Sequence, residues 1–240
     1  MEYLPVFIVC LAGSIIQGIT GFGFAMVVMS FLPFFLPMRT AAVISLLMTV
    51  YTGVMVSMML RKSMNLRVAV FPVVASLLSI PLGVYLLLSF PEKLLRILLG
   101  VLIMALSIFF FINSKRNIKI KPHPMNGIVA GLVSGMTTGM FNIGGPPLVL
   151  YYLHATADKL VYRACLEFSF AVGAIFAFTN HIVHGNVDMQ MFSYSLVGAA
   201  AVTIGNLMGL TLFKKLNPGV ITKSVYAVMF VLSITIILKN

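Results

Sequence analysis

The sequence Gln17-Gly18-Ile19-Thr20-Gly21-Phe22-Gly23-Phe24 interrupts a long apolar stretch near the start of the chain. A second interruption reads Gly139-Met140-Phe141-Asn142-Ile143-Gly144-Gly145-Pro146-Pro147. Gly18 and Gly139 are separated by 121 residues, and the same interval separates Gly23 from Gly144. In lipid, a broken helix leaves backbone N–H and C=O groups without partners, which costs several kcal/mol per group. Two matching breaks therefore predict a polar site at membrane depth.

The composition is that of a protein that crosses a membrane several times. Of the 240 residues, 60% are hydrophobic and only 9% are charged, against about 25% in a soluble domain. The basic residues behind the net charge of +11 are scattered over short loops. This distribution is typical of membrane proteins that follow the positive-inside rule, and it excludes a continuous nucleic-acid-binding face. Cys10 and Cys165 lie in apolar surroundings, so we expect free thiols without a disulfide or a metal site.

Eight apolar segments can be distinguished, and six of them have the length of a transmembrane helix, which is about 20 residues. These six segments cover 40–60, 68–89, 92–113, 160–180, 189–212 and 218–238. The two remaining segments, 3–37 and 125–153, contain the glycine breaks. As one helix, segment 3–37 would measure about 52 Å, which exceeds a bilayer core of about 30 Å even when tilted. Two half-helices that enter and leave on the same side would fit.

The distribution of Lys and Arg favours such re-entrant hairpins. If both glycine segments crossed the membrane, the 16 basic residues would divide equally between the two sides. If both are hairpins, 12 lie on one side, which the positive-inside rule assigns to the cytoplasm. These are Arg61, Lys62, Arg67, Lys115, Arg116, Lys119, Lys121, Lys159, Arg163, Lys214, Lys215 and Lys223, against Arg39, Lys93, Arg96 and Lys239 on the other side.

The predicted fold is all-α and integral to the membrane, with two inverted repeats, each a broken re-entrant helical hairpin followed by three transmembrane helices. The first repeat covers 1–114, a basic cytoplasmic linker 115–123, and the second repeat 124–240. Further matches support the repeat, because Asn65 corresponds to Asn186 and Gly83 to Gly209. Three crossings per half invert the second half and place both termini outside the cytoplasm. Inverted repeats with paired broken helices are typical of secondary transporters.

The breaks carry the residues predicted to bind a ligand. A half-helix N-terminus presents unpaired N–H groups and about half a positive charge, so two of them near the midplane would hold an anion. The alternative is that the glycines only permit tight helix packing, which is the better interpretation for Gly131, Gly135, Gly205 and Gly209. The predicted substrate-binding residues are Gln17, Thr20, Gly21, Gly23, Phe24, Thr138, Asn142, Gly144, Gly145 and Pro146, with Thr137 nearby.

Glu167 is an acidic residue well inside an apolar segment, and such residues are functional candidates. It could bind a proton that moves with the anion. Arg163, four residues earlier on the same helical face, offers the alternative of a structural ion pair. His181 and His184, followed by Asp188, could hold a metal, but a solvated pair of loop histidines is the favoured interpretation. Neither a nucleophile–base pair nor a metal cluster appears in the sequence, so we expect no cofactor and no enzyme activity.

The two motifs resemble those of the sulfite exporter TauE/SafE family, also described as the four-toluene-sulfonate uptake permease family. The resemblance rests on Gly18–Phe24 followed by Pro33, and on Gly139–Pro146 followed by Tyr152-Leu153. It implies a permease of the bacterial inner membrane that moves small anions such as sulfite or organosulfonates. The second motif reads Gly144-Gly145-Pro146-Pro147 where the first reads Gly23-Phe24-Ala25-Met26, which suggests that the two halves hold the substrate unequally.

We therefore predict a secondary transporter that works by alternating access, driven by protons or by the membrane potential. Two alternatives stay open at this point, namely an anion channel on the same backbone and an intramembrane enzyme that uses Glu167. The expected partners are a small anionic substrate and the lipid bilayer, without nucleic acid. A homo-oligomer is compatible with the sequence, which does not fix the number of subunits, the direction of transport or the anion.

Overall fold

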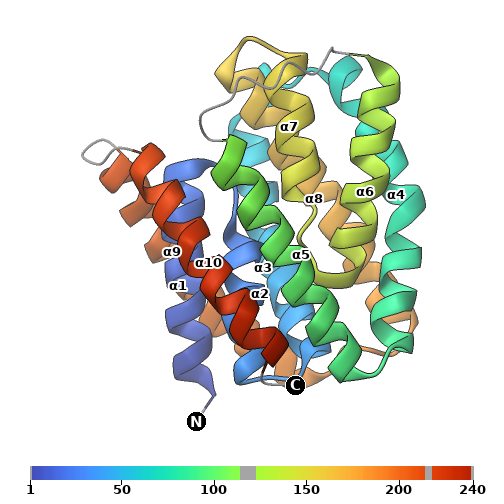
Figure 1. Cartoon of the computed structure of the whole chain (residues 1–240). Coiled ribbons are helices and arrows are strands. Elements are labelled where there is room, and N and C mark those ends of the chain that lie inside the picture. Colours follow the sequence, from blue (N-terminus) through green and yellow to red (C-terminus); the bar gives the residue numbers. More distant parts are fainter. Residues whose placement is uncertain (1, 114–122, 214–217, 239–240) are drawn as a thin grey trace. The chain divides into compact units, whose positions relative to one another are not determined.

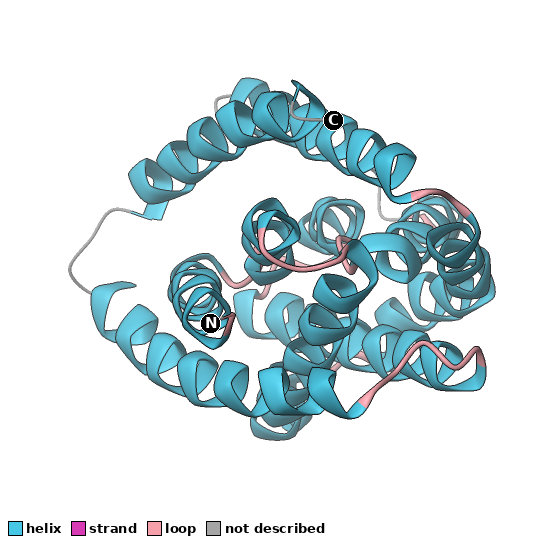
Figure 2. Ribbon diagram, turned by 90° about the horizontal axis from the view of Figure 1, so that it is seen from below, coloured by secondary structure: helices cyan, strands magenta, loops and turns pink. Residues whose placement is uncertain are grey.

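The computed structural model describes residues 2–113, 123–213 and 218–238, and these residues form helices joined by short loops without a strand (Figures 1 and 2). The predicted all-α fold is confirmed. The α-helices are α1 (Tyr3–Thr20), α2 (Phe24–Phe31), α3 (Met38–Met59), α4 (Leu66–Ser89), α5 (Glu92–Asn113), α6 (Pro124–Phe141), α7 (Gly145–Ala155), α8 (Lys159–Val183), α9 (Met189–Phe213) and α10 (Pro218–Leu238), with short 3₁₀ turns η1 (Leu32–Phe34) and η2 (Arg61–Ser63).

Six described helices are long and apolar enough to cross a membrane, so the chain is a multi-pass membrane protein. Five of them, α3, α4, α5, α8 and α9, are spans predicted from the sequence, and α1 is the sixth. The remaining predicted span, 218–238, is the 21-residue helix α10. Its part Tyr226–Leu238 is apolar but shorter than a membrane span. Linker residues 115–122 and the basic residues Lys214, Lys215 and Lys239 lie outside the described part of the chain.

Both predicted breaks are present. Segment 3–37 divides into α1 and α2, and segment 125–153 divides into α6 and α7. The legs are unequal, because α1 and α6 have 18 residues each whereas α2 has 8 and α7 has 11. A helix of 18 residues is about 27 Å long, close to the thickness of the hydrocarbon core. The long leg of each predicted hairpin therefore reaches deep into the bilayer before the chain breaks.

The helices group into two compact units that do not follow the sequence halves. One unit contains residues 1–45, 90–118 and 188–240, and the other contains residues 46–89 and 119–187. Each unit therefore combines one broken segment with helices from the opposite half of the chain. The division into repeats at 1–114 and 124–240 stays a prediction about sequence, and inversion of the repeats stays a prediction as well.

In the first unit, α1 packs along α9 through small residues (Figure 1). Gly18 lies against Gly209, where a Cβ built on Gly18 would be 3.0 Å from the Gly209 Cα. One turn away, Gly205 lies against Ser14, whose hydroxyl a Cβ would strike. Such small-residue contacts let helix backbones approach closely in membranes. The long leg of the first break is therefore held by α9.

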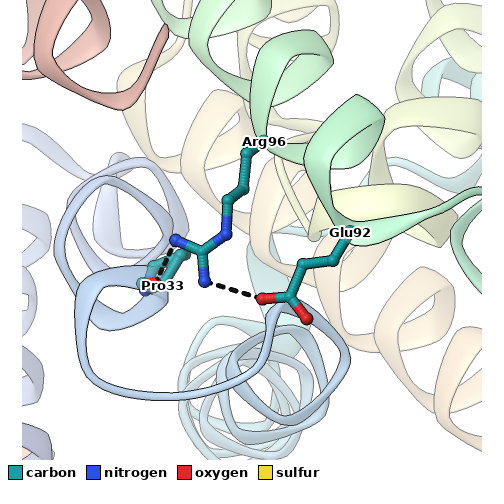
Figure 3. A network of polar contacts seen from close by, with 3 residues as sticks. All are labelled: Pro33, Glu92 and Arg96. Carbon is teal, nitrogen blue, oxygen red and sulfur yellow. Dashed lines mark hydrogen bonds and ion pairs between the residues drawn. The ribbon is translucent and has the colours of Figure 1, made fainter. Parts of the chain in front are cut away.

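The same unit also secures the far end of the short leg. Arg96 on α5 donates to the backbone carbonyl of Pro33 in η1 at 2.6 Å and forms an ion pair with Glu92 at 2.6 Å (Figure 3). Glu92 also begins α5, where a carboxylate interacts favourably with the helix dipole. This contact ties the end of the α2–η1 segment to a membrane-spanning helix.

In the second unit, α4 packs along α6 in an equivalent way. A Cβ on Gly139 would lie 3.0 Å from the Gly83 Cα, and one on Gly135 would lie 2.6 Å from the Ser76 Cα and strike Ser79. Gly139 corresponds to Gly18 in the predicted repeat, and Gly83 corresponds to Gly209. Each glycine pair thus joins one predicted repeat to the other. The packing interpretation of Gly131, Gly135, Gly205 and Gly209 fits these contacts.

The close α4–α6 contact generates a stability prediction. Replacing Gly135 with Ala forces two backbones apart, and we expect a loss of about 1–3 kcal/mol in the free energy of unfolding. Gly173→Ala on α8 is the matched control, because its Cβ would lie 3.7 Å from the end of the Ile80 side chain. That variant should be neutral or stabilised by up to about 1 kcal/mol. Unfolding in mixed micelles measures both, and equal effects would contradict the packing role of Gly135.

Candidate functional site

Both long legs end in the same backbone conformation. Gly21 follows α1 with φ +83°, and Asn142 follows α6 with φ +57°. These residues occupy equivalent positions of the predicted repeat, 121 apart. In both cases the backbone N–H bonds back to the last turn, to Gln17 O at 2.7 Å and to Thr138 O at 2.8 Å. Left-handed caps of this kind are dominated by Gly and Asn, because other residues resist positive φ.

The first break is stabilised by a threonine. The Thr20 hydroxyl lies 2.8 Å from the Ile16 carbonyl oxygen and 2.5 Å from that of Phe22, so it can donate to either of them. Gly23 then has φ +100° and starts α2 by accepting from the Val27 N–H at 3.1 Å. The ring of Phe22 lies 5.8 Å from that of Phe110. The carbonyl groups of Gln17, Phe22 and Gly23 at this break thus have hydrogen-bond donors within the same segment.

A small crevice of about 10 Å³ borders Gly23 within the first unit. Its walls include Thr20, Met26 and Tyr226. That volume is close to the minimum for one water molecule. A ligand of several heavy atoms does not fit this crevice as the helices stand in the structure.

The second break is stabilised by side chains of α6 and α3. Ser134 donates to the Gly144 carbonyl oxygen at 2.7 Å, and the Asn142 amide donates to the Thr49 hydroxyl at 2.8 Å. Gly144 has an ordinary φ of −83°, so its need for glycine comes from close approach. A Cβ there would strike the Thr138 hydroxyl and lie 2.6 Å from that of Ser134. The first break is thus stabilised by the hydroxyl of its own Thr20, and the second by Ser134 of α6 and Thr49 of α3.

The half-helices that follow the breaks differ in the number of hydrogen-bond donors they offer. The first-turn N–H groups of a helix have no partner within it. In α2, Phe24, Ala25 and Met26 each contribute one. In α7, only Gly145 does, because the next two positions are Pro146 and Pro147. Both half-helices keep their dipole, but over the first three helical positions α2 offers three backbone donors and α7 offers one.

The predicted binding residues separate into two groups, one in each unit, and each group surrounds its own break. Gln17 is 6% exposed, and its Oε1 has no hydrogen-bond partner among the described residues. The Phe24 side chain is 3% exposed and packs against Gly13, so its backbone is what remains for a ligand. Gly145 has Phe170 beside it, at 3.3 Å from a built Cβ. Gly18 and Gly139 serve helix packing.

The candidate coupling residues lie on α8. Glu167 is 1% exposed and lies about 12 Å along the helix from Lys159. Arg163 precedes it by about one turn, and its Nε is buried without a hydrogen-bond partner among the described residues. A buried carboxyl is compatible with both predicted roles of Glu167, namely proton binding and an ion pair with Arg163. Which of the two roles it has stays a prediction.

The expectation for the histidines is partly wrong. His184 is exposed, but His181 is fully buried, with its Nδ1 2.9 Å from the Asn186 amide nitrogen. The predicted span ended at residue 180, whereas α8 continues to Val183. His181 is therefore part of the helix and is buried. The described residues contain no group of three His, Cys, Asp or Glu side chains that could hold a metal. Asn65 caps the start of α4, and the Asn186 N–H donates to the His181 carbonyl oxygen at 2.9 Å in the turn after α8.

Sequence reasoning missed four residues that support the breaks. Ser134 lies one turn before Thr138, so its helical spacing could have revealed it. Thr49 and Tyr226 come from distant helices, and no local pattern points to them. Phe110 on α5 contacts the ring of Phe22 and is stacked on that of Tyr226, with 5.0 Å between the latter two ring centroids.

Comparison with known proteins gives an independent result. The family model described as "Sulfite exporter TauE/SafE" matches residues 6–236. The chain is also similar to a "Probable sulfite/organosulfonate exporter TauE" of Cupriavidus necator, with 24% identity over 210 residues that cover 82% of this chain and 79% of the relative. No solved structure matches. Because the family model covers nearly the whole chain, including both breaks, this multi-pass membrane protein belongs to the sulfite exporter TauE/SafE family of transporters.

Proposed function

We propose that this chain moves a small anion, sulfite or an organosulfonate, across the bacterial inner membrane as a secondary transporter. The observation that carries the proposal is the pair of broken helices, each capped in the left-handed region, in a chain that the exporter family model matches. The name of the relative from Cupriavidus necator supports both this class of substrate and export as the direction. No enzyme activity is part of the proposal.

The anion binds at the N-terminal ends of the half-helices that follow the breaks. Sulfite and sulfonates carry negative oxygens, which accept hydrogen bonds from backbone N–H groups and are attracted by the positive ends of helix dipoles. Because α2 keeps three first-turn N–H groups and α7 keeps one, the first break supplies most of the direct hydrogen bonds. Thr138 is the side-chain donor next to the second break, whereas the Thr20 hydroxyl at the first break is engaged with backbone carbonyl groups. A binding site without Lys or Arg holds the anion loosely enough to release it.

Transport follows from motion of the helices around the breaks. The crevice beside Gly23 is too small for the substrate, so binding requires α2 or α10 to move. Rocking or bending of this kind would expose the site first to one side of the membrane and then to the other. The inverted topology, with both termini outside the cytoplasm and 12 basic residues on the cytoplasmic side, remains part of this proposal.

Flux measurements in proteoliposomes test the transporter directly. We expect counterflow of labelled sulfite or of an organosulfonate that saturates with concentration and occurs without measurable unitary current. Counterflow is a property of a carrier, because one site that faces the two sides in turn carries unlabelled substrate one way and labelled substrate back. Large unitary anion currents without counterflow would assign the same backbone to a channel, and absence of both for all sulfur anions tested would contradict the proposal.

Removing one backbone donor from α2 tests where the anion binds. Ala25→Pro deletes the N–H at the position that Pro146 occupies in α7, where the fold already accepts proline. A hydrogen bond to a charged group contributes about 1.5–3 kcal/mol, so KM for the anion should rise about tenfold or more. Ala25→Ser keeps the N–H and is the matched control. Equal KM values for the two folded variants would place the anion elsewhere.

Glu167→Gln tests coupling to protons. If Glu167 carries the proton, the variant should lose stimulation of flux by an imposed pH gradient but keep counterflow, since exchange needs no net proton movement. Arg163→Gln serves as the comparison, because a purely structural pair would make both variants less stable and leave the response to pH intact. Measurement of flux with and without the gradient, together with thermal unfolding, distinguishes these results.

A further inference from the structure

An open cavity of about 720 Å³ lies in the second unit, and its lining contains no residue of either break. It is formed where the loop between α3 and α4 meets the start of α8. The residues that matter for its chemistry are Lys62, Asn65, Leu66, Arg67, Asp158 and Val161. None of them belongs to the breaks at residues 17–24 and 139–147, so the transport proposal assigns this cavity no role.

The cavity is electrostatically positive. Lys62 and Arg67 are exposed, and neither forms an ion pair among the described residues. Arg61 and Lys159 are neighbours of the lining residues in the sequence but do not line the cavity. The acidic residue of the lining, Asp158, uses its Oδ1 to cap α8, where it accepts from the N–H groups of Leu160 at 2.7 Å and Val161 at 3.3 Å. The two cations are therefore available to an anionic group.

The walls of the cavity are held in place before any ligand binds. Asn65 Oδ1 accepts from the Arg67 N–H at 3.1 Å and so caps α4. The carbonyl oxygen of Asn65 accepts from the Cys165 thiol on α8 at 3.5 Å. The loop that carries the cations is thus attached to both helices. A preformed site loses little conformational entropy on binding.

Exposed apolar side chains adjoin the cations. Leu66, which lines the cavity, is 60% exposed, and Leu160 is 56% exposed. Met59, at the end of α3, is 76% exposed. A soluble anion would make no use of these side chains, whereas a phospholipid places its headgroup near cations and its acyl chains beside apolar surface at the same boundary. Basic pockets between transmembrane helices bind anionic headgroups in this way.

We propose that this cavity binds the phosphate-bearing headgroup of an anionic membrane phospholipid, with Lys62 and Arg67 as the cationic contacts and the exposed leucines against the acyl chains. The ligand chemistry is a phosphate group, and the lipid is its source. On the predicted topology, the cavity faces the cytoplasmic leaflet, whose anionic lipids attract Lys and Arg near the membrane surface. The site is independent of the anion that the protein transports.

Native mass spectrometry of the purified full-length protein in an uncharged detergent tests this site, with phosphatidylglycerol and phosphatidylcholine of the same acyl chains as probes. We expect one phosphatidylglycerol to bind in preference to phosphatidylcholine. The double variant Lys62→Ala/Arg67→Ala should bind it about 25-fold more weakly, since each of the two cations contributes about fivefold. Both residues are exposed, and unchanged thermal unfolding without lipid will show that the variant is folded.

The matched control is Arg61→Ala/Lys159→Ala, which removes the same charge from the same region but from residues that do not line the cavity. It should change the affinity for phosphatidylglycerol by less than about twofold. Equal losses in both double variants would show general attraction between basic loops and anionic lipid, and would overturn the site. If inorganic phosphate binds as tightly as the lipid and shows the same loss in Lys62→Ala/Arg67→Ala, the site belongs to a soluble anion and the lipid proposal is wrong.

Discussion

The structure depends on one constraint, namely that a chain in lipid must satisfy the hydrogen bonds of its own backbone. Regular helices do so automatically, and a break at membrane depth does not. At the first break, Gly21 bonds back to Gln17, and the Thr20 hydroxyl lies within hydrogen-bond distance of the Phe22 carbonyl. At the second, Ser134 donates to Gly144. What is left over, the first-turn N–H groups of α2 and α7, is what an anion can use.

The contacts that hold the breaks also explain why so many small residues occur in the chain. A long leg can end abruptly only if the rest of it is firmly attached. α1 is attached to α9 by the Gly18–Gly209 contact, and α6 is attached to α4 by the Gly139–Gly83 contact. Because each contact joins one half of the sequence to the other, neither half makes a compact unit alone.

The two breaks are alike in position but different in chemistry. Gly21 and Asn142 provide the same left-handed cap, whereas the following half-helices differ because two prolines replace backbone donors in α7. Under the proposed function, these unequal donors would make the two breaks bind an anion with different strength. The unequal motifs already suggested this difference, and the positions of the donors give it a physical basis.

The sequence by itself determined the all-helical membrane fold, most helix bounds and the positions of both breaks, because apolar run length and glycine clusters act locally. α5, for example, begins and ends where the apolar segment 92–113 does. Only the tertiary structure decided which glycines pack and which turn, since Gly18 and Gly21 differ in their neighbours and not in their type. It also brought Thr49 to Asn142 and buried His181. These contacts join residues from separate helices, and no pattern along one helix specifies which helix will be its neighbour.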